Sequence, residues 1–437
     1  MANGIVIRPS AENANVAALQ NAYDKMQALS GSDNRSWIYW SEFHGFNRFE
    51  CWHHARHGND DFPYDLFLPW HRAYLTFFDN AARDQDENAI LPWWDWTSDV
   101  SHASGIPAAY RSTAAPALQT GPMPSINGQP PRRTGRNPRN PSSLPTKQQV
   151  DDLLDLTDYR DFSNQLQDIH DGVHGWVRGD MGSIGVSAFD PVFWAHHCMI
   201  DRIWYLWQQK HGVNNIPPEY LDKALFPGYT VQQVLDVRGL GYDYAAGAVA
   251  AGTDVPAGAG GATPTPAATD KVINNAEEPG EPEPPVAGKK YKSKQINVGV
   301  LDPDFSRADI EFHNVDHAGA SYEGRVYINN PDADADTGYE DASYAGSYHI
   351  FGHGGCLGDA GHCDVEPRRK YDPRPAHQLT PAKKVVIATE AVRRAVQAGD
   401  KAAITVVPIV APLPYETEAR HTKSPVKIGY VRIITYR

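Results

Sequence analysis

Two histidines at helical spacing are the first residues of this chain whose types and positions could do chemistry. His170 and His174 lie four residues apart in FSNQLQDIHDGVHGW. Because an α-helix turns once in about 3.6 residues, both imidazoles project from one face. Neutral imidazole nitrogens suit copper, zinc, nickel or iron, so this pair predicts half of a metal site. Two unrelated helix histidines are the plain alternative.

A third imidazole is predicted from the segment DPVFWAHHCMIDRIWYLWQQ. Phe193, His197 and Asp201 follow one another at intervals of four residues, so His197 points the way of the apolar face. His196 is turned from that face by about 100°. We predict His197 as a ligand and Asp201, one turn below it, as a carboxylate that orients an imidazole.

The N-terminal region holds a comparable set of histidines. His44 lies in WSEFHG and His71 lies in FLPWHRAYL. Three more, in a cluster directly after Cys51, are His53, His54 and His57. If one histidine of this cluster joins His44 and His71, the chain has two groups of three, which indicates two metal ions. The absence of carboxylates at these positions disfavours a dinuclear zinc or iron hydrolase.

Four segments in this order, FLPWHRAYL, LPWWDWT, HDGVHGW and DPVFWAHHCMIDRIW, resemble the tyrosinase, catechol oxidase and haemocyanin group, the type 3 copper proteins. The resemblance covers about residues 35 to 210. It implies a four-helix core with two copper ions that bind dioxygen between them, each ion held by three histidines. Carried over motif by motif, it implies copper A on His44, His53 and His71, and copper B on His170, His174 and His197.

The prediction of the second copper A ligand depends on a cysteine. In many members of this family a cysteine two residues before this ligand is bonded through sulfur to the histidine ring, and Cys51-Trp52-His53 has that spacing. GNDDFPYDL contains an insertion relative to the family, so the spacing to His71 does not identify this ligand. The Cys-x-His spacing does, and we therefore predict His53, with His54 or His57 as alternatives. An ordinary small buried cysteine is the alternative for Cys51.

The resemblance implies an enzyme that uses O₂ as co-substrate on small-molecule phenols and catechols. It would ortho-hydroxylate monophenols and oxidise o-diphenols to o-quinones; a catechol oxidase without hydroxylation and a haemocyanin-like oxygen carrier are the alternatives. Family members often hold a water with a Glu and an Asn near the first copper B histidine, where this chain has Gln167 and Asp171. We predict that these two residues hold the water and move its proton, that Ile184 leaves access to copper A open, and that His196 lines the substrate entrance.

The elements that must position these residues are helical in the first half and β-rich in the second. Apolar residues recur at three and four residues behind a possible cap at Ser10, and further helices are predicted over about 35–45, 70–84, 161–176 and 191–210. All 11 tryptophans lie at or before Trp207, so the halves are built differently. We predict a two-domain α+β protein with a mainly α four-helix-bundle dicopper domain (1–244), an Ala/Gly/Pro/Glu-rich linker (245–290) and a β-sandwich-like covering domain (291–437).

A C-terminal domain of this kind covers the copper site in several family members, and it inserts a side chain at the substrate position until it is cleaved or displaced. The segment SYAGSYHIFGHGGCLGDAGHC is the predicted point of contact. An aromatic ring resembles a phenol, so Tyr348 or Phe351 is the predicted plug. Cys356 and Cys363 are interpreted as a disulfide or free thiols in a Gly-rich loop, with a structural metal site or a copper-delivery site as alternatives.

Charge and hydropathy exclude other classes of partner. There are 40 Lys and Arg against 53 Asp and Glu, and a net charge of −13 repels nucleic acid and anionic lipid. No run reaches the roughly 18 apolar residues of a membrane helix. The start MANGIVIRPSAEN lacks a secretory signal pattern, so we expect a cytoplasmic protein, with export on a carrier protein as the alternative. The oligomeric state has no signal in the sequence.

Overall fold

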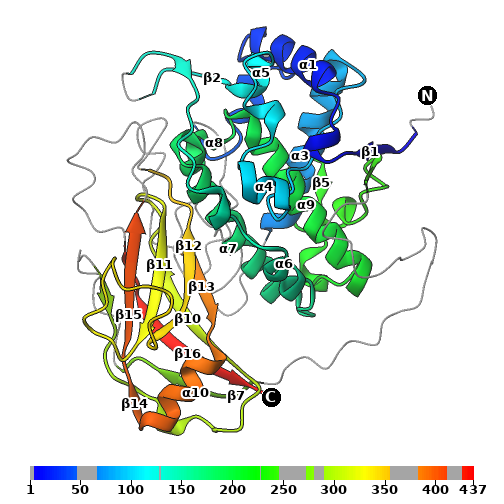
Figure 1. Cartoon of the computed structure of the whole chain (residues 1–437). Helices are drawn as coiled ribbons and strands as arrows, with labels where there is room; N and C mark the ends of the chain where they lie inside the picture. The colour runs from blue at the N-terminus through cyan, green and yellow to red at the C-terminus, as the bar shows by residue number, and fades with distance from the viewer. Residues whose placement is uncertain are drawn as a thin grey trace.

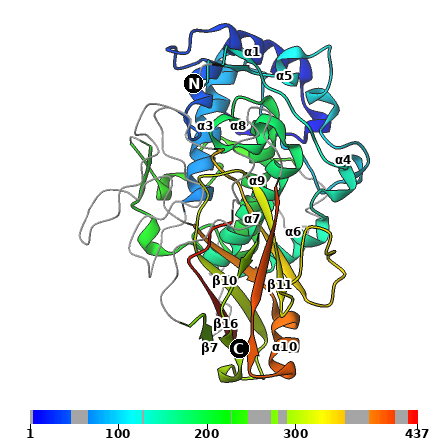
Figure 2. The ribbon, with the colours of Figure 1, turned by 90° about the vertical axis from the view of Figure 1, so that its left-hand side faces the viewer.

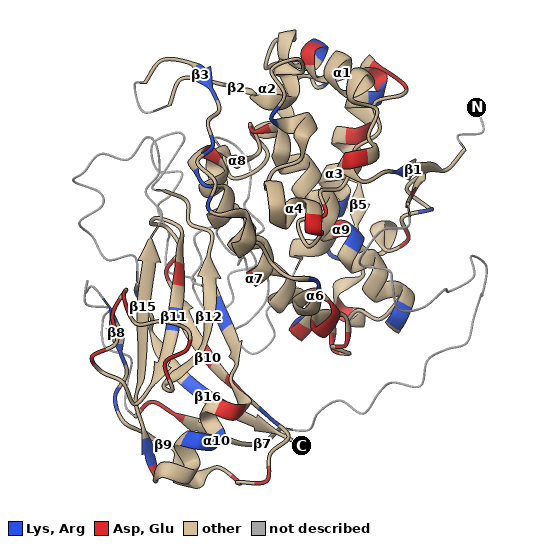
Figure 3. Ribbon diagram, in the orientation of Figure 1, with Lys and Arg blue, Asp and Glu red and all other residues tan. Residues whose placement is uncertain are grey.

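The computed structural model describes residues 4–46, 66–126, 129–226, 228–245, 272–279, 290–354, 382–410 and 426–437. A helical part built from the first half of the chain lies beside a strand-rich part built from the second half (Figure 1). A view from the side shows the same division (Figure 2). Acidic and basic residues occur over both parts (Figure 3). Among these residues, no helix has the length and hydropathy needed to cross a membrane.

Three long helices carry four of the six predicted metal ligands. These are α3 (Phe67–Gln85), α7 (Tyr159–Val177) and α9 (Pro191–His211), and α3 contacts both of the others. An aspartate caps the N-terminus of α7 and another caps that of α9. The Asp158 carboxylate accepts hydrogen bonds from the backbone amides of residues 160 and 161, and the Asp190 carboxylate accepts one from the amide of residue 192. Pro191 then occupies the first turn of α9, where its missing N–H costs nothing.

The helix α1 (Val16–Ala28) packs on α3, and its cap corrects the sequence prediction. Asn15, not Ser10, caps it: the Asn15 side chain accepts from the Ala18 amide at 3.2 Å. Ser10 precedes a separate short turn and forms a bridge with Trp93. The helix expected over 35–45 is shorter than predicted. The remaining helices of the first half are α2 (Trp37–Ser41), α4 (Asp99–Ser104), α5 (Pro116–Gln119), α6 (Lys147–Leu154) and α8 (Ile184–Ser187).

The main apolar core of the helical part contains the buried tryptophans of the described residues. Phe78 of α3 stacks on Trp194 of α9, which joins two of the ligand-bearing helices. A parallel pair of β1 (Val6–Arg8) and β6 (Tyr242–Tyr244) connects the beginning of this part to its end. Short hairpins complete it: β2 (Pro122–Met123) with β3 (Arg132–Arg133), and β4 (Ala224–Phe226) with β5 (Tyr229–Thr230).

The strand-rich part contains two four-stranded antiparallel sheets that share one core. The first has the order β13 (Ala382–Ile387), β10 (Arg307–Val315), β16 (Tyr430–Tyr436), β7 (Val272–Glu277). The second has the order β12 (Tyr344–Ile350), β11 (Tyr322–Ile328), β15 (Ile404–Val410), β8 (Tyr291–Lys292). The helix α10 (Thr389–Ala398) and the pair β9 (Ile296–Asn297) and β14 (Lys401–Ala402) lie at the end remote from the helical part (Figures 1 and 2).

The strand β7 corrects the predicted linker. It falls within the range 245–290 that was expected to be without structure, yet it pairs with β16 along its length. An edge strand is held by backbone hydrogen bonds and buries little of its own surface, so VINNAE gives a weak sequence signal. Residues 246–271 of the predicted linker lie outside the described residues.

The two parts meet along α7. This helix contacts β11, β12 and β13, so the element that carries two predicted ligands is also the one that the strand-rich part covers. Residues of the strand-rich part therefore contact the helix that carries His170 and His174.

Candidate metal centre

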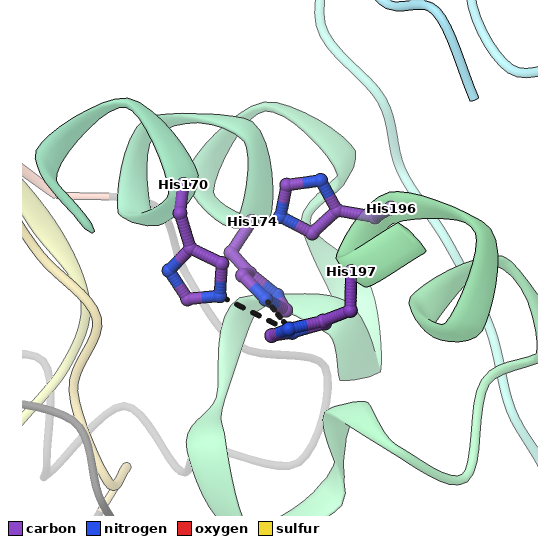
Figure 4. A group of neighbouring side chains, drawn as sticks. All are labelled: His170, His174, His196 and His197. Atoms are coloured by element: carbon purple, nitrogen blue, oxygen red, sulfur yellow. Dashed lines mark hydrogen bonds between the residues drawn. The ribbon is translucent and has the colours of Figure 1, made fainter. Parts of the chain in front are cut away.

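Five predicted ligands come together in two groups of buried imidazoles. One group contains His170 and His174 of α7 with His196 and His197 of α9, and the other contains His44 and His71 with His197. The ring nitrogens converge closely: His197 Nε2 lies 3.2 Å from His170 Nε2 and 3.4 Å from His174 Nε2 (Figure 4). In the second group, His71 Nε2 lies 3.4 Å from His44 Nε2. The HxxxH pair, the partner on α9 and the N-terminal pair are therefore neighbours in space.

The opposite ring nitrogens hold these imidazoles in place. Nδ1 of His44 donates to the Ile184 carbonyl at 2.9 Å, and Nδ1 of His71 donates to the Phe67 carbonyl at 2.7 Å. Nδ1 of His174 donates to the Met181 carbonyl at 2.7 Å. Each contact fixes the tautomer and leaves Nε2 as the lone-pair donor toward the centre, which is the arrangement of a metal-binding histidine.

Burial keeps the imidazoles neutral. All five are at most 2% exposed. Desolvation lowers the pKa of His44 to about 4 and holds the pKa values of the other four well below the ordinary value for histidine. Clustered imidazoles that resist protonation fit copper, and no carboxylate belongs to either described group, which disfavours magnesium or calcium.

His196 differs from the prediction that it lines an entrance. Its side chain is fully buried, and its ring stacks on His170 with a centroid distance of 5.1 Å. Burial lowers its pKa to about 3. Figure 4 shows it as a member of the group, whereas the close nitrogen contacts run from His170 and His174 to His197.

Asp201 also has a role that differs from the predicted one. Its carboxylate accepts from Arg72 Nε at 2.5 Å and from the hydroxyls of Tyr242 and Tyr244, so its bonds within the described chain go to these groups and not to an imidazole. Burial opposes its charge, but the Arg72 and Arg8 guanidinium groups outweigh this and lower the pKa of Asp201. Spacing along α9 gave the face of Asp201 but not the neighbour on that face.

Breaking this buried pair should destabilise the fold. Asp201→Asn is expected to cost about 3–5 kcal/mol in the free energy of unfolding, because Arg72 would keep its charge without its anionic partner. Urea denaturation measures the loss. The matched control is Asp155→Asn, which removes the exposed pair with Lys210 and should cost at most about 1 kcal/mol. Equal losses of unfolding free energy in the two variants would show that Asp201 contributes no more to stability than the exposed Asp155.

Asp171 contacts one predicted ligand directly. Its Oδ1 accepts from His170 Nδ1 at 3.0 Å and its Oδ2 accepts from Lys384 Nζ at 2.8 Å. Burial raises the pKa of Asp171 to about 7, against the opposing effect of Lys384. Gln167 lies one turn earlier on α7 and is also buried. The predicted partnership of Asp171 and Gln167 around a water remains a prediction, and Lys384 is a partner that sequence reasoning missed.

The strand-rich part inserts Phe351 into the site. The Phe351 ring stacks on His174 with a centroid distance of 3.9 Å and meets the His170 ring edge to face at 5.8 Å. Ile184 packs against it, and the Ile184 amide donates to the Gly352 carbonyl. Tyr348, the other predicted plug, instead packs in the core between the sheets against Phe312 and Tyr322.

The sixth predicted ligand falls outside the described residues. These exclude Cys51 with His53, His54 and His57, and also Cys356 and Cys363. The choice among the three histidines, the sulfur bond to His53 and the state of the two C-terminal cysteines therefore stay predictions.

Comparison with known proteins agrees with this geometry. The common central domain of tyrosinase matches residues 20–128 and 110–210. A tyrosinase of Streptomyces lincolnensis is 35% identical over 189 residues, which cover 37% of this chain and 67% of the relative. The chain belongs to the tyrosinase family. A tyrosinase of Streptomyces antibioticus is 36% identical over 174 residues, which cover 33% of this chain and 63% of that relative. The match thus spans about two thirds of these tyrosinases.

Solved structures of the family share the whole fold. A latent aurone synthase, a polyphenol oxidase, has a TM-score of 0.61 at 16% identity and covers 100% of this chain and 91% of its own. Latent apple tyrosinase has a TM-score of 0.59 at 18% identity, with 99% and 98% covered. A functional unit of octopus hemocyanin has a TM-score of 0.57 at 16% identity, with 97% and 99% covered. The tyrosinase family implies a dicopper centre, and the two histidine groups could hold it.

Proposed function

We propose that this member of the tyrosinase family is a phenol oxidase that uses O₂ to ortho-hydroxylate monophenols and to oxidise o-diphenols to o-quinones. The observation that carries the proposal is the convergence of buried, neutral imidazoles from α3, α7, α9 and the turn after α2 into two adjoining groups. His44 and His71 would hold one copper with a third ligand from the 53–57 cluster. His170, His174 and His197 would hold the other.

The chain's own residues orient and protect this centre. A pair of copper ions supplies, when bound, the dioxygen binding and redox capacity that side chains lack. Backbone carbonyls fix His44, His71 and His174, while aromatic rings such as Phe193, 4.1 Å from the His197 ring, exclude water. A phenol must lose its proton before it can be hydroxylated, and Asp171 with Gln167 is the proposed site for the water that takes it.

We further propose that the intact chain is latent. The Phe351 ring fills the space beside His174 that a phenol ring would need, and Ile184 packs against Phe351. Displacement or cleavage of the strand-rich part would remove the ring. An oxygen carrier is the second candidate, which the likeness to the octopus hemocyanin unit supports.

Oxygen uptake by the copper-loaded protein tests this function. Uptake should be measured with a monophenol and with a catechol, on the intact chain and on a chain cleaved at a protease site introduced between residues 246 and 271. We expect little turnover before cleavage and turnover of both substrates afterwards. Turnover of the catechol alone would indicate a catechol oxidase. A cleaved protein that binds two coppers and O₂ but oxidises neither substrate would be an oxygen carrier.

A further inference from the structure

The face of α7 toward the strand-rich part carries a row of carboxylates, and cations from the other part meet them. The three helix residues, Asp161, Asp168 and Asp171, follow one another at intervals of seven and three residues, which places them on one side of α7. The pairs are Asp161 with Arg307 at 2.9 Å, Asp168 with His349 at 3.0 Å, and Asp171 with Lys384 at 2.8 Å. The covering part thus binds the ligand-bearing helix through charge as well as through apolar contact.

The pair of Asp171 and Lys384 is the most enclosed of these. The side chain of Lys384 on β13 is 2% exposed and that of Asp171 is fully buried. Taking both charges out of water costs several kcal/mol per ion, and their attraction offsets this only when the geometry is good. Two apolar side chains would fill this position at lower cost, so the pair calls for an explanation beyond stability.

A second contact of Asp171 supplies that explanation. The oxygen not bonded to Lys384 accepts from His170 Nδ1 at 3.0 Å. His44, His71 and His174 use backbone carbonyls for the corresponding contact, and a carbonyl on a helix or turn cannot rotate away. The His170 imidazole is held instead by a carboxylate on a rotatable side chain, and Lys384 fixes the second oxygen of that carboxylate.

We infer that Lys384 of the strand-rich part is a positioning residue of the second copper site, which holds the Asp171 carboxylate so that it orients His170. The inference rests on the proposed dicopper site and extends it: the C-terminal part would complete one metal site while Phe351 blocks the substrate. Displacing the C-terminal part would then admit substrate and also loosen one ligand.

Copper affinity of the full chain tests this inference. Lys384→Met should weaken the binding of one of the two copper equivalents about tenfold, the lower end of the effect of losing a group that orients a ligand. Cu(I) competition with a chromogenic chelator under nitrogen measures both equivalents. Lys384→Arg should restore most of the affinity. Lys383→Met is the matched control, since Lys383 is the neighbouring lysine on β13 and its side chain pairs with Glu311.

A double-mutant cycle separates positioning from general damage. Asp171→Asn should weaken the same equivalent, and Asp171→Asn with Lys384→Met should be no weaker than Asp171→Asn alone, because both changes interrupt one path. In the background of His71→Ala, which disables the first site, the effect of Lys384→Met should persist. The double variant also removes both buried charges, so it provides a folded protein even if one single variant is unstable.

The outcomes are distinct for the inference and for the function on which it rests. Wild-type affinity of both equivalents in Lys384→Met, or equal weakening of both together with a lower melting temperature, would overturn the inference. If the wild-type chain binds no pair of coppers, the proposed function fails instead. If it binds two coppers and oxidises phenols while Lys384→Met binds them equally well, only the role of Lys384 is lost.

Discussion

Replacing Phe351 with alanine should activate the uncleaved chain toward catechol. We expect at least about a tenfold rise in oxygen uptake, because a tethered group competes with substrate at an effective concentration of the order of millimolar. The removed ring leaves open the face of His174 on which it stacks at 3.9 Å. The loss of a buried phenyl group also weakens the packing of the strand-rich part on Ile184, which acts in the same direction. Oxygen uptake at matched copper content measures the effect.

The control for this variant is an aromatic residue of the same part whose ring contacts go to Arg325 and Tyr344 and not to the two histidine groups. Tyr339 is 53% exposed, and Tyr339→Ala should leave the latency unchanged. A Phe351→Ala protein that keeps two coppers but oxidises catechol no faster than the wild-type chain would exclude Phe351 as the block. Latency would then have to come from the other contacts between the two parts.

The alternation of side chains along β12 distinguishes Tyr348 from Phe351. Side chains alternate along a strand, so Tyr348 and Ile350 of β12 share a face, and both are buried in the core between the sheets. Phe351 directly follows Ile350, so the same alternation turns it away from that core. A period-two reading of SYAGSYHIF would have assigned Tyr348 to the core and left Phe351 as the plug.

The helices that carry the predicted ligands were predictable because their signals are local. The HxxxH spacing, the Asp-Pro start of α9 and the apolar stripe around His197 depend on neighbours within a few residues. The contacts of Asp171 with Lys384 and of Asp201 with Arg72 join residues that are 213 and 129 positions apart. Helical spacing gives the face of each aspartate, but the partner on that face depends on how the parts pack.

The adjacent histidines of α9 allow the sharpest test of the metal centre. His197→Gln should remove one copper and lower phenol oxidation at least about a thousandfold, since even groups that only orient a ligand contribute 10–100-fold. His197 belongs to both histidine groups, and its Nε2 meets those of His170 and His174. Metal analysis of the purified variant, together with oxygen uptake on catechol, measures both effects.

The matched variant His196→Gln changes the next residue of the same helix. Its ring stacks on His170 without the close nitrogen contacts that His197 makes, so two coppers should remain bound. Some loss of copper affinity is expected, because His196 supports the His170 ring from one side, but the stoichiometry should stay at two. Loss of one copper in His196→Gln and retention of both in His197→Gln would reverse the assignment. The ligand would then be the histidine that the apolar stripe of α9 does not include, and the spacing argument for this helix would fail with it.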